Sequence, residues 1–364
     1  MNALEGLFAL GPYSLRAPEK QTLLVDHLNR LTAHHRRACE AYARIYRAWP
    51  RSAATITRLD QFPFLPVRLF RELDLKSVDD EDVIKTLTSS GTTSGKVSRI
   101  FLDKQTSHLQ TKALAAIVMD FIGKKRRPML IIDCPGVIKE RRLFSARGAG
   151  ILGMANFGRD HLYVLDDGMN LRWPELNDFL KRHDGEKLLL FGFTYMVWQH
   201  FYLELRRSPS HVDLSRGVLV HSGGWKKLSE QAVDNAAFKA SLKDVCGLEK
   251  VHNFYGMVEQ TGSVFMECGA GHLHAPIFSD VIVRNPYDWS PLESGRRGVV
   301  EVLSILPYSY PGHVLLTEDV GEILGEDDCP CGRLGKYFSI HGRLRRVESR
   351  GCSDTYAEEV ARAV

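Results

Sequence analysis

Short apolar runs alternate with helix-forming stretches between residues 84 and 254, and this alternation constrains the fold more than any other feature of the chain. The strand-like runs are residues 84–88, 129–132, 163–165, 187–191, 217–220 and 251–254. Helical spacing of apolar residues predicts helices between several of them, at residues 106–122, 173–182, 195–206 and 229–242. Strands that alternate with helices usually pair in parallel and are covered by those helices. We therefore expect an α/β fold with a largely parallel sheet.

The chain has a different character on either side of this region. Residues 20–48 place Leu24, Leu28 and Leu31 at helical spacing, which predicts one long amphipathic helix. After residue 262 the pattern favours strands and few helices. The expected organisation is a large domain over residues 1–342, made of an α/β core at 84–262 and a β-rich subdomain at 263–342, followed by a short C-terminal segment at 343–364.

Composition and charge exclude several classes of protein. A hydrophobic content of 44% is typical of a globular chain with a sizeable core. The net charge of +4 is a weak excess, and the basic clusters lack interleaved aromatic residues, so we expect no nucleic-acid partner. No apolar run approaches the roughly 20 residues of a membrane span, and the N-terminus lacks the features of a signal peptide. Seven cysteines without framework spacing predict a reduced, cytoplasmic setting.

The stretch LTSSGTTSGKVSRI, residues 87–100, is built almost entirely from small, hydroxylated or basic residues. Backbone amides around Gly91 and Gly95, together with the neighbouring hydroxyls, would form a nest for phosphate oxygens, and Lys96 would neutralise charge. It is not a Walker A loop, because three residues separate the two glycines and Val97 stands where that motif has Ser or Thr. Strand-like residues follow, so the pattern predicts a hairpin-like phosphate loop. The alternative is a flexible linker, which rarely lies between two strands of a compact domain.

The loop resembles the phosphate loop of adenylate-forming enzymes, the superfamily of acyl-CoA synthetases and peptide-synthetase adenylation domains. Four further stretches resemble that superfamily's motifs and occur in its order. They are SGGW at 222–225, NFYGMVEQTG at 253–262, LLTEDVGEI at 315–323 and HGRLRRVESRGC at 341–352. Val258 and Glu318 depart from the superfamily pattern, in place of its usual Thr and Gly.

The resemblance implies an adenylate-forming, acyl-CoA synthetase-like large domain that uses ATP and Mg²⁺. Loop residues would hold the phosphates, a Gly-Gly turn and a Tyr-Gly pair would lie at the adenine, an aspartate would accept the ribose hydroxyls, and a glutamate would hold Mg²⁺. The phosphate-loop residues are Ser89, Ser90, Gly91, Thr92, Thr93, Gly95 and Lys96. The Gly-Gly turn is Gly223 and Gly224, and the Tyr-Gly pair is Tyr255 and Gly256. The ribose-binding aspartate is Asp319, the Mg²⁺-binding glutamate is Glu259, and Arg343 would contact ribose or phosphate at the hinge. Each of these residues, taken alone, has a structural alternative. Tyr255 would be an aromatic residue of the core, Glu259 a carboxylate at a helix N-terminus, and Asp319 a turn residue.

Most adenylate-forming enzymes continue into a further domain with a late lysine, whereas here the last lysine is Lys336, before the hinge. The short tail carries Cys352 next to several arginines, which would lower the pKa of its thiol and favour the nucleophilic thiolate. This arrangement resembles the acyl-protein synthetases of bacterial bioluminescence operons. In that family an activated fatty acid passes to a C-terminal cysteine and then to an acyl reductase. The alternative is that Cys352 is an inert small residue.

A second group of cysteines lies in the β-rich region. Cys268, His272 or His274, Cys329 and Cys331 provide a Cys₃His set, which is typical of a closed structural zinc site. His274 is the better candidate, because its spacing from Cys268 is similar to that in phenylacetate-CoA ligase-like enzymes. Reduced thiols in two turns remain the alternative.

These features together predict an enzyme that activates a carboxylic acid, expected to be a fatty acid, as acyl-AMP and transfers it to Cys352. An acyl-CoA reductase-like protein is the expected partner. One rival is an acid:CoA or acid:carrier-protein ligase with a separate thiol acceptor. Another is an inactive nucleotide-binding regulator, against which the retained Glu259, Asp319 and Arg343 argue.

Overall fold

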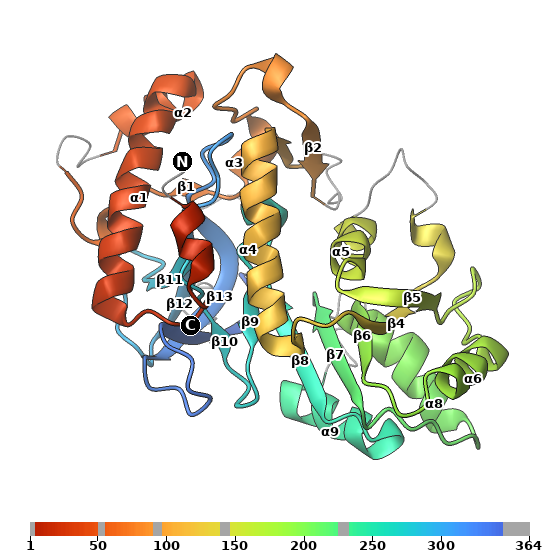
Figure 1. Ribbon diagram of the computed structural model, residues 1–364. Helices are drawn as coiled ribbons and strands as arrows, with labels where there is room; N and C mark the ends of the chain where they lie inside the picture. The colour runs from red at the N-terminus through yellow and green to blue at the C-terminus, as the bar shows by residue number, and fades with distance from the viewer. Residues whose placement is uncertain (1–3, 50–54, 90–96, 139–145, 225–232, 345–364) are drawn as a thin grey trace, which may run out of the picture. The chain divides into compact units, whose positions relative to one another are not determined.

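The structure is a computed structural model that describes residues 4–49, 55–89, 97–138, 146–224 and 233–344. The chain divides into two compact units. The first unit contains residues 1–117, 256–265 and 272–364, and the second contains residues 118–255 and 266–271. The second unit is drawn mainly in yellow and green in Figure 1.

The second unit contains a parallel sheet, as the alternating pattern predicts. Its strands run in the order β8-β7-β6-β4-β5, and every neighbouring pair among them is parallel. Its elements are β4 (Arg127–Ile132), η4 (Pro135–Ile138), α5 (Ala146–Ala155), β5 (Gly158–Tyr163), α6 (Trp173–Arg182), β6 (Leu188–Phe193), α7 (Thr194–Met196), the π-helix η5 (Val197–Tyr202), α8 (Leu203–Arg207), β7 (Gly217–Ser222), α9 (Asn235–Cys246) and β8 (Lys250–Tyr255).

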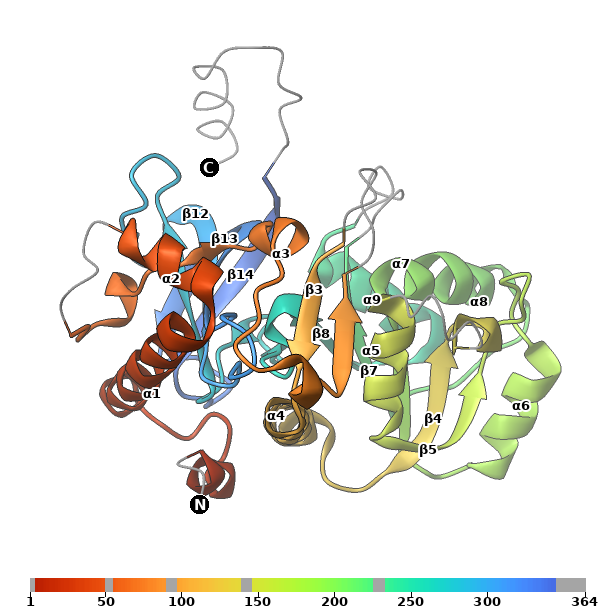
Figure 2. The ribbon, with the colours of Figure 1, turned by 90° about the horizontal axis from the view of Figure 1, so that it is seen from above.

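Helices cover both faces of this sheet, which explains why its central strands are almost wholly apolar. On one face, Leu130 and Leu190 pack with Phe179 of α6, Phe201 of η5 and Phe238 of α9. On the other face α5 lies against β6, where a side chain added at its Gly150 would meet Phe193 and Phe191. Figure 2 shows α5 and α6 beside the strands β4 and β5. The strand order reverses between β4 and β6, and open sheets of this kind bind ligands at the carboxyl ends of their strands.

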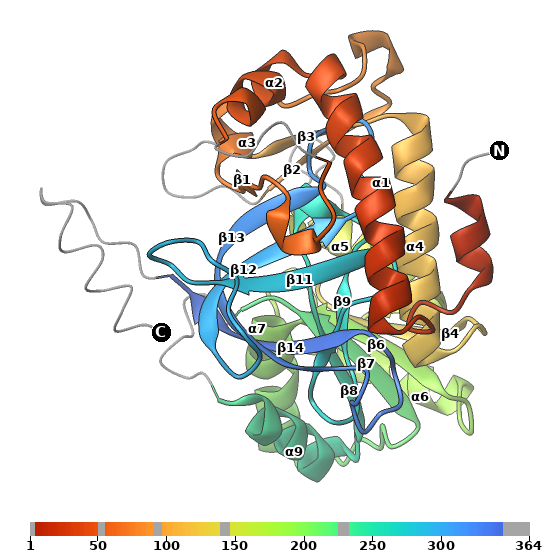
Figure 3. The ribbon, with the colours of Figure 1, turned by 90° about the vertical axis from the view of Figure 1, so that its left-hand side faces the viewer.

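The first unit contains an antiparallel sheet with the strand order β11-β12-β13-β14-β10, and β1 pairs in parallel with β13. Figure 3 shows β11 to β14 next to one another, with α1 and α2 in red. The elements of this unit are η1 (Glu5–Ala9), α1 (Ala17–Ala38), α2 (Glu40–Arg47), η2 (Leu59–Gln61), β1 (Leu65–Pro66), α3 (Leu69–Glu72), η3 (Asp80–Asp82), β2 (Lys85–Thr88), β3 (Arg99–Leu102), η7 (Val258–Gln260), β10 (Leu273–His274), β11 (Ser279–Arg284), β12 (Arg297–Ser304), β13 (Val314–Glu326) and β14 (Lys336–Arg343); α4 (Lys104–Ile122) and β9 (Phe265–Glu267) cross the sequence boundaries between the units.

The prediction of one continuous helix over residues 20–48 is wrong. It is broken at Cys39, whose backbone is extended (φ −125°, ψ 104°), and this separates α1 from α2. His35 and Tyr42 both contact the ring of His313, with centroid distances of 4.8 and 5.5 Å. In an unbroken helix these two residues would lie about 10 Å apart along the axis, so the break brings both onto one ring.

Two other predicted boundaries are also wrong. The sequence predicts a strand at residues 163–165, but the strand in the structure is β5, which ends at Tyr163. Leu165 forms only an isolated bridge with Leu171. β5 lies at the edge of the sheet and has mostly polar residues, so its sequence lacks the apolar run by which a buried strand is predicted. The helix expected from residue 229 begins at Asn235, because Asp234 is its N-cap and accepts a hydrogen bond from the Ala237 amide (2.8 Å).

Among the described residues, no helix is both long and apolar enough to cross a membrane.

Candidate active site and Cys/His cluster

The strands β2 and β3 form the antiparallel stem of the predicted phosphate loop, with Thr88 paired to Arg99. The Ser89 amide donates to the Ser98 carbonyl (3.2 Å), and the Ser98 amide donates to Ser89 Oγ (2.9 Å). The hairpin form of the loop is therefore confirmed at its base. The predicted phosphate-binding residues within it lie outside the described residues: Ser90, Gly91, Thr92, Thr93, Gly95 and Lys96.

Glu259 lies in the short helix η7 of the first unit and is 6% exposed. Burial raises the pKa of this carboxyl, while the Ser98 hydroxyl and the positive charges of Arg71 and Arg343 act in the opposite direction. The structure thus brings Glu259 to the base of the phosphate-loop hairpin. Sequence reasoning missed Ser98 and Arg71 as its neighbours. Ser98 lay within the quoted loop stretch, whereas Arg71 carried no signal because it is distant from Glu259 in the sequence.

The backbone around Glu259 is held by buried contacts. The side-chain amide of Gln260 donates through Nε2 to the carbonyl oxygens of Val302 (3.1 Å) and Gly312 (2.9 Å). A side chain at Gly312 would lie 2.8 Å from the Glu259 carbonyl oxygen, so this close approach requires glycine. Tyr310 is fully buried, and burial raises the pKa of its phenol, with the charge of Glu259 adding to the effect. These contacts fix the position of the glutamate.

Asp319 and Arg343 face each other across β13 and β14 of the same unit. They are register partners, and Arg343 Nε lies 3.4 Å from Asp319 Oδ1. The Asp319 side chain is 15% exposed and that of Arg343 is 73% exposed. The Asp319 amide donates to Thr317 Oγ1 (3.1 Å), whose hydroxyl donates to the Val300 carbonyl (2.7 Å). The carboxylate is therefore held on a rigid strand, with an exposed cation beside it.

In the second unit, Gly223 and Tyr255 come at the carboxyl ends of the neighbouring strands β7 and β8. The two strands pair in parallel up to Ser222 and Phe254, and Ser222 Oγ donates to the Phe254 carbonyl (2.8 Å). Gly223 has φ +87°, and a side chain there would meet Phe193 at 3.2 Å. Gly224 and Gly256 follow Gly223 and Tyr255 directly in the sequence. The structure therefore brings Gly223, which begins the Gly-Gly turn, and Tyr255 to one edge of the sheet.

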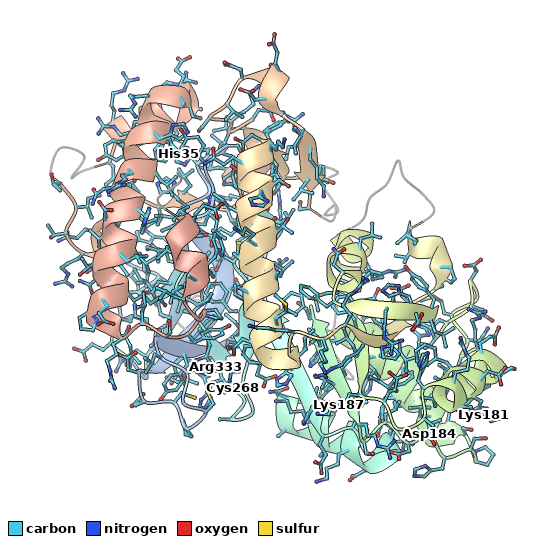
Figure 4. All side chains as sticks on the ribbon, viewed as in Figure 1. His35, Lys181, Asp184, Lys187, Cys268 and Arg333 are labelled. Carbon is cyan, nitrogen blue, oxygen red and sulfur yellow. The ribbon has the colours of Figure 1, made fainter. Side chains whose placement is uncertain are left out.

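Four side chains form a potential metal-binding cluster: Cys268, His274, Cys329 and Cys331 offer ligand atoms that all lie within 4.8 Å of one another. The Cys331 sulfur lies 3.3 Å from His274 Nε2. Cys268, labelled in Figure 4, and His274 are fully buried. Burial lowers the pKa of His274 to about 4, which leaves the imidazole neutral, as a metal ligand must be.

The donor set fits zinc. Tetrahedral zinc with bonds of about 2.3 Å to sulfur needs ligand atoms about 3.8 Å apart, and all ligand atoms of the cluster lie within 4.8 Å of one another, so small side-chain movements suffice to hold the ion. The neighbouring His272 contacts Cys329 through Nδ1 at 3.4 Å, but His274 completes the cluster.

Comparison with solved structures defines the class of fold. An open conformation of 2-hydroxyisobutyryl-CoA ligase, solved with 2-HIB-AMP and CoA, is similar with a TM-score of 0.67 and 16% identity, over 92% of this chain and 79% of that one. The same ligase in its thioesterification state gives a TM-score of 0.69 at 16% identity, over 90% and 69% of the two chains. The fold is that of an adenylate-forming CoA ligase.

Sequence comparison defines the family within that class. The family model described as "Acyl-protein synthetase, LuxE" matches residues 4–361, so the chain belongs to the acyl-protein synthetase (LuxE) family of ligases. The long-chain-fatty-acid--luciferin-component ligase of Aliivibrio fischeri is 22% identical over 84% of this chain and 80% of its own length. The ligase of the same name from Vibrio harveyi is 23% identical over 80% and 76%.

Proposed function

We propose that this enzyme uses ATP and Mg²⁺ to activate a long-chain fatty acid as acyl-AMP, and then transfers the acyl group to its own Cys352. The match of an acyl-protein synthetase model to residues 4–361 carries this proposal. The buried Glu259 beside the phosphate-loop stem and the Asp319–Arg343 pair support it.

In the first step, a carboxylate oxygen of the fatty acid attacks the α-phosphorus of ATP. The bond from that phosphorus to the bridging oxygen breaks, and pyrophosphate leaves. Catalysis of such a step consists mainly of positioning and charge stabilisation. Ser89 and the loop residues through Lys96 hold the β- and γ-phosphates, Asp319 accepts the ribose hydroxyls, and Arg343 contacts ribose or phosphate.

The adenine lies beside Gly223, Gly224, Tyr255 and Gly256. Glycine at 223 permits the positive φ and the close approach to Phe193 that this turn requires. Glu259 holds Mg²⁺, which when bound offsets the charge of the phosphates. The carboxyl of Glu259 is well placed for this role, since a nearby cation would favour its ionised form against the effect of burial.

In the second step, the Cys352 thiolate attacks the acyl carbonyl carbon. A carbon–sulfur bond forms, the carbon–oxygen bond to phosphate breaks, and AMP leaves. Cys352 lies outside the described residues. An acyl-CoA reductase-like protein then receives the acyl group from the thioester, in line with the resemblance of the tail to that of acyl-protein synthetases.

The Cys/His cluster of Cys268, His274, Cys329 and Cys331 holds a structural zinc ion in this proposal. Three sulfurs and one imidazole nitrogen leave no coordination position for substrate, which excludes a catalytic role of the usual open kind. When bound, zinc would cross-link β10, which carries His274, to the loop before β14, which carries Cys329 and Cys331.

Intact-mass spectrometry tests the acyl transfer. The full-length enzyme is incubated with ATP, Mg²⁺ and a series of fatty and aryl acids, without CoA. We expect an acyl adduct that hydroxylamine removes. Cys352→Ala should abolish the adduct while ATP–pyrophosphate exchange persists, and Cys39→Ala, which removes a different thiol, should retain both.

The rival functions give different results. Pyrophosphate exchange without an adduct, with turnover only after CoA or a carrier protein is added, would identify a ligase with a separate thiol acceptor. ATP binding without either exchange or adduct for any acid would identify a nucleotide-binding regulator.

A further inference from the structure

The chain before and within the first turn of α1, called here the N-terminal segment (residues 12–20), contacts the two stretches that carry the Cys/His cluster. The Ile277 amide donates to the Pro12 carbonyl (2.8 Å). The Leu334 amide donates to the Tyr13 carbonyl (3.2 Å). One of these donors follows the cluster histidine in sequence, and the other follows the cluster cysteines. The N-terminal segment is thus hydrogen-bonded to both stretches at once.

Asp327 joins the cysteine loop to the start of α1. Its Oδ1 accepts from the Gly335 amide (2.7 Å), which closes the loop that contains Cys329 and Cys331. Its Oδ2 accepts from the amide of Ala17, the first residue of α1 (2.8 Å). A single carboxylate therefore sets the shape of the loop and satisfies an amide at the N-terminus of the helix, where negative charge is favourable.

Lys20 makes a second connection. Its side chain is almost fully buried, and its Nζ donates to the Ala275 carbonyl (2.9 Å). Ala275 directly follows His274. A side chain at Gly335 would lie 3.2 Å from the same Nζ, so the ammonium group packs against the end of the cysteine loop. Asp280, at 4.0 Å, provides the opposite charge that a buried lysine needs.

The ring of Tyr13 makes a third set of contacts with the cluster region, in addition to those of Asp327 and Lys20. The Tyr13 ring meets the His274 ring edge-on at 5.9 Å. The Tyr13 ring also contacts the guanidinium of Arg333, which lies over it at 5.5 Å from the ring centre. Movement of either the histidine or the cysteine loop would therefore disturb the tyrosine of the N-terminal segment.

We propose that metal binding at the Cys/His cluster and docking of the N-terminal segment form one coupled equilibrium, in which Asp327 and Lys20 are the positioning residues. The proposal rests on the structural zinc ion proposed above. Ligation of a metal by the cluster fixes the positions of the cysteine loop and of the chain after His274, and both of these hold the segment. Coupling between two binding events is reciprocal, so a docked segment must raise the affinity for the metal by the same factor.

Hydrogen exchange on the full-length protein tests one direction of this coupling. We expect removal of zinc by a chelator to increase amide exchange in residues 12–24, with exchange in β12 unchanged. Restoring zinc should restore the protection.

Variants on the helix side of the contacts test the other direction. Ala17→Pro removes only the amide that donates to Asp327, and proline is well tolerated at the first position of a helix. Lys20→Met keeps the buried aliphatic chain and removes the ammonium. Zinc affinity, measured by competition with a chromophoric chelator, should fall about three- to tenfold in each variant, the size expected for the net contribution of one typical hydrogen bond. Asp288→Asn, which changes a carboxylate that caps a turn elsewhere in the unit, should bind zinc as the parent does.

The outcomes separate the two proposals. If elemental analysis of the purified protein and the competition assay both show no zinc binding, the metal proposal fails and the coupling fails with it. If zinc binds but Ala17→Pro and Lys20→Met retain the parental affinity, and chelation leaves exchange in residues 12–24 unchanged, the metal proposal stands and the coupling is wrong. ATP–pyrophosphate exchange measures the proposed acid activation independently of both.

Discussion

Glu259 is a carboxyl group that the fold removes from water and places near the cations Arg71 and Arg343. Glu259→Gln preserves its shape and removes the charge proposed to hold Mg²⁺. We expect ATP–pyrophosphate exchange to fall by about 10²- to 10³-fold, the range seen when one preorganised electrostatic group is lost. Stability should be retained, because burial already raises the pKa of this group and so opposes its charged form.

The control for that variant is Glu322→Gln, on β13 of the same unit, which should leave exchange within about twofold of the parent. Parental exchange rates in Glu259→Gln would contradict the role in Mg²⁺ binding.

Arg284 and Glu301 form an ion pair between β11 and β12, with side chains 5% and 0% exposed. Arg284 Nη2 lies 3.0 Å from Glu301 Oε1 and also donates to the Asp60 carbonyl (2.9 Å). Removing one partner leaves an uncompensated buried charge, so Arg284→Met should lower the free energy of unfolding by about 3–5 kcal/mol. Urea denaturation measures this change.

The exposed pair Arg30–Asp26 on α1 provides the comparison, with side chains 64% and 55% exposed. Arg30→Met should change stability by less than about 1 kcal/mol. Equal effects of the two substitutions would show that burial does not determine the importance of these pairs.

Helices α1 and α2 pack on the chain that links β12 to β13 through a group of buried histidines. His35, labelled in Figure 4, bonds Ser77 Oγ through Nδ1 (2.8 Å), and His313 bonds Thr32 Oγ1 through Nε2 (3.1 Å). Burial holds the pKa of His35 well below its usual value and lowers the pKa of His313 to about 3. Both imidazoles are therefore neutral in the folded state at neutral pH.

A histidine in the unfolded chain takes up a proton near pH 6.5. Below that pH the unfolded state binds more protons than the folded state, so the free energy of unfolding falls as pH falls from 6.5 toward the lower folded pKa. Between pH 7.5 and 5.5 we expect a loss of about 1.4 kcal/mol for each of the two residues. Urea denaturation at the two pH values measures it.

Substitution identifies the source of this pH dependence. His35→Gln should reduce the loss by about 1.4 kcal/mol, the share of one buried histidine, whereas His161→Gln, at an exposed position, should leave it unchanged. A loss that is the same in all three proteins would exclude His35 as one of its causes.

At the scale of the whole molecule, ATP should stabilise the folded chain, because a ligand that binds only the folded state shifts the unfolding equilibrium toward it. ATP with Mg²⁺ at about 100 times its dissociation constant should add about 2.7 kcal/mol to the free energy of unfolding, which a thermal shift detects. Asp319→Asn should reduce this shift, because one neutral acceptor oxygen replaces the two charged oxygens proposed for the ribose hydroxyls, while Asp288→Asn should retain it. An undiminished shift in Asp319→Asn would contradict the ribose role.

Much of the architecture was predictable because secondary structure leaves a local periodic signal. The apolar runs at Met129, Leu189 and Val218 indicated central strands, and the structure has them in β4, β6 and β7. The hairpin base at Ser89 and Ser98 was predictable for the same reason.

The candidate site was predictable only in part. The family-like motifs indicated Glu259, Asp319 and Arg343, since their residue types and order are features of the sequence itself. They did not indicate Arg71, whose charge reaches Glu259 only after the chain has folded.

The sequence by itself therefore determined the order and type of most elements and the residues that carry the proposed chemistry, because period, turn residues and motif spacing act over a few positions. Only the tertiary structure decided the break at Cys39, the approach of Arg71 to Glu259, and the link between α1 and the Cys/His cluster through Asp327. The physical reason is that each of these depends on contacts between residues far apart in the chain. Local preference permits many such pairings, and packing in the folded protein selects one.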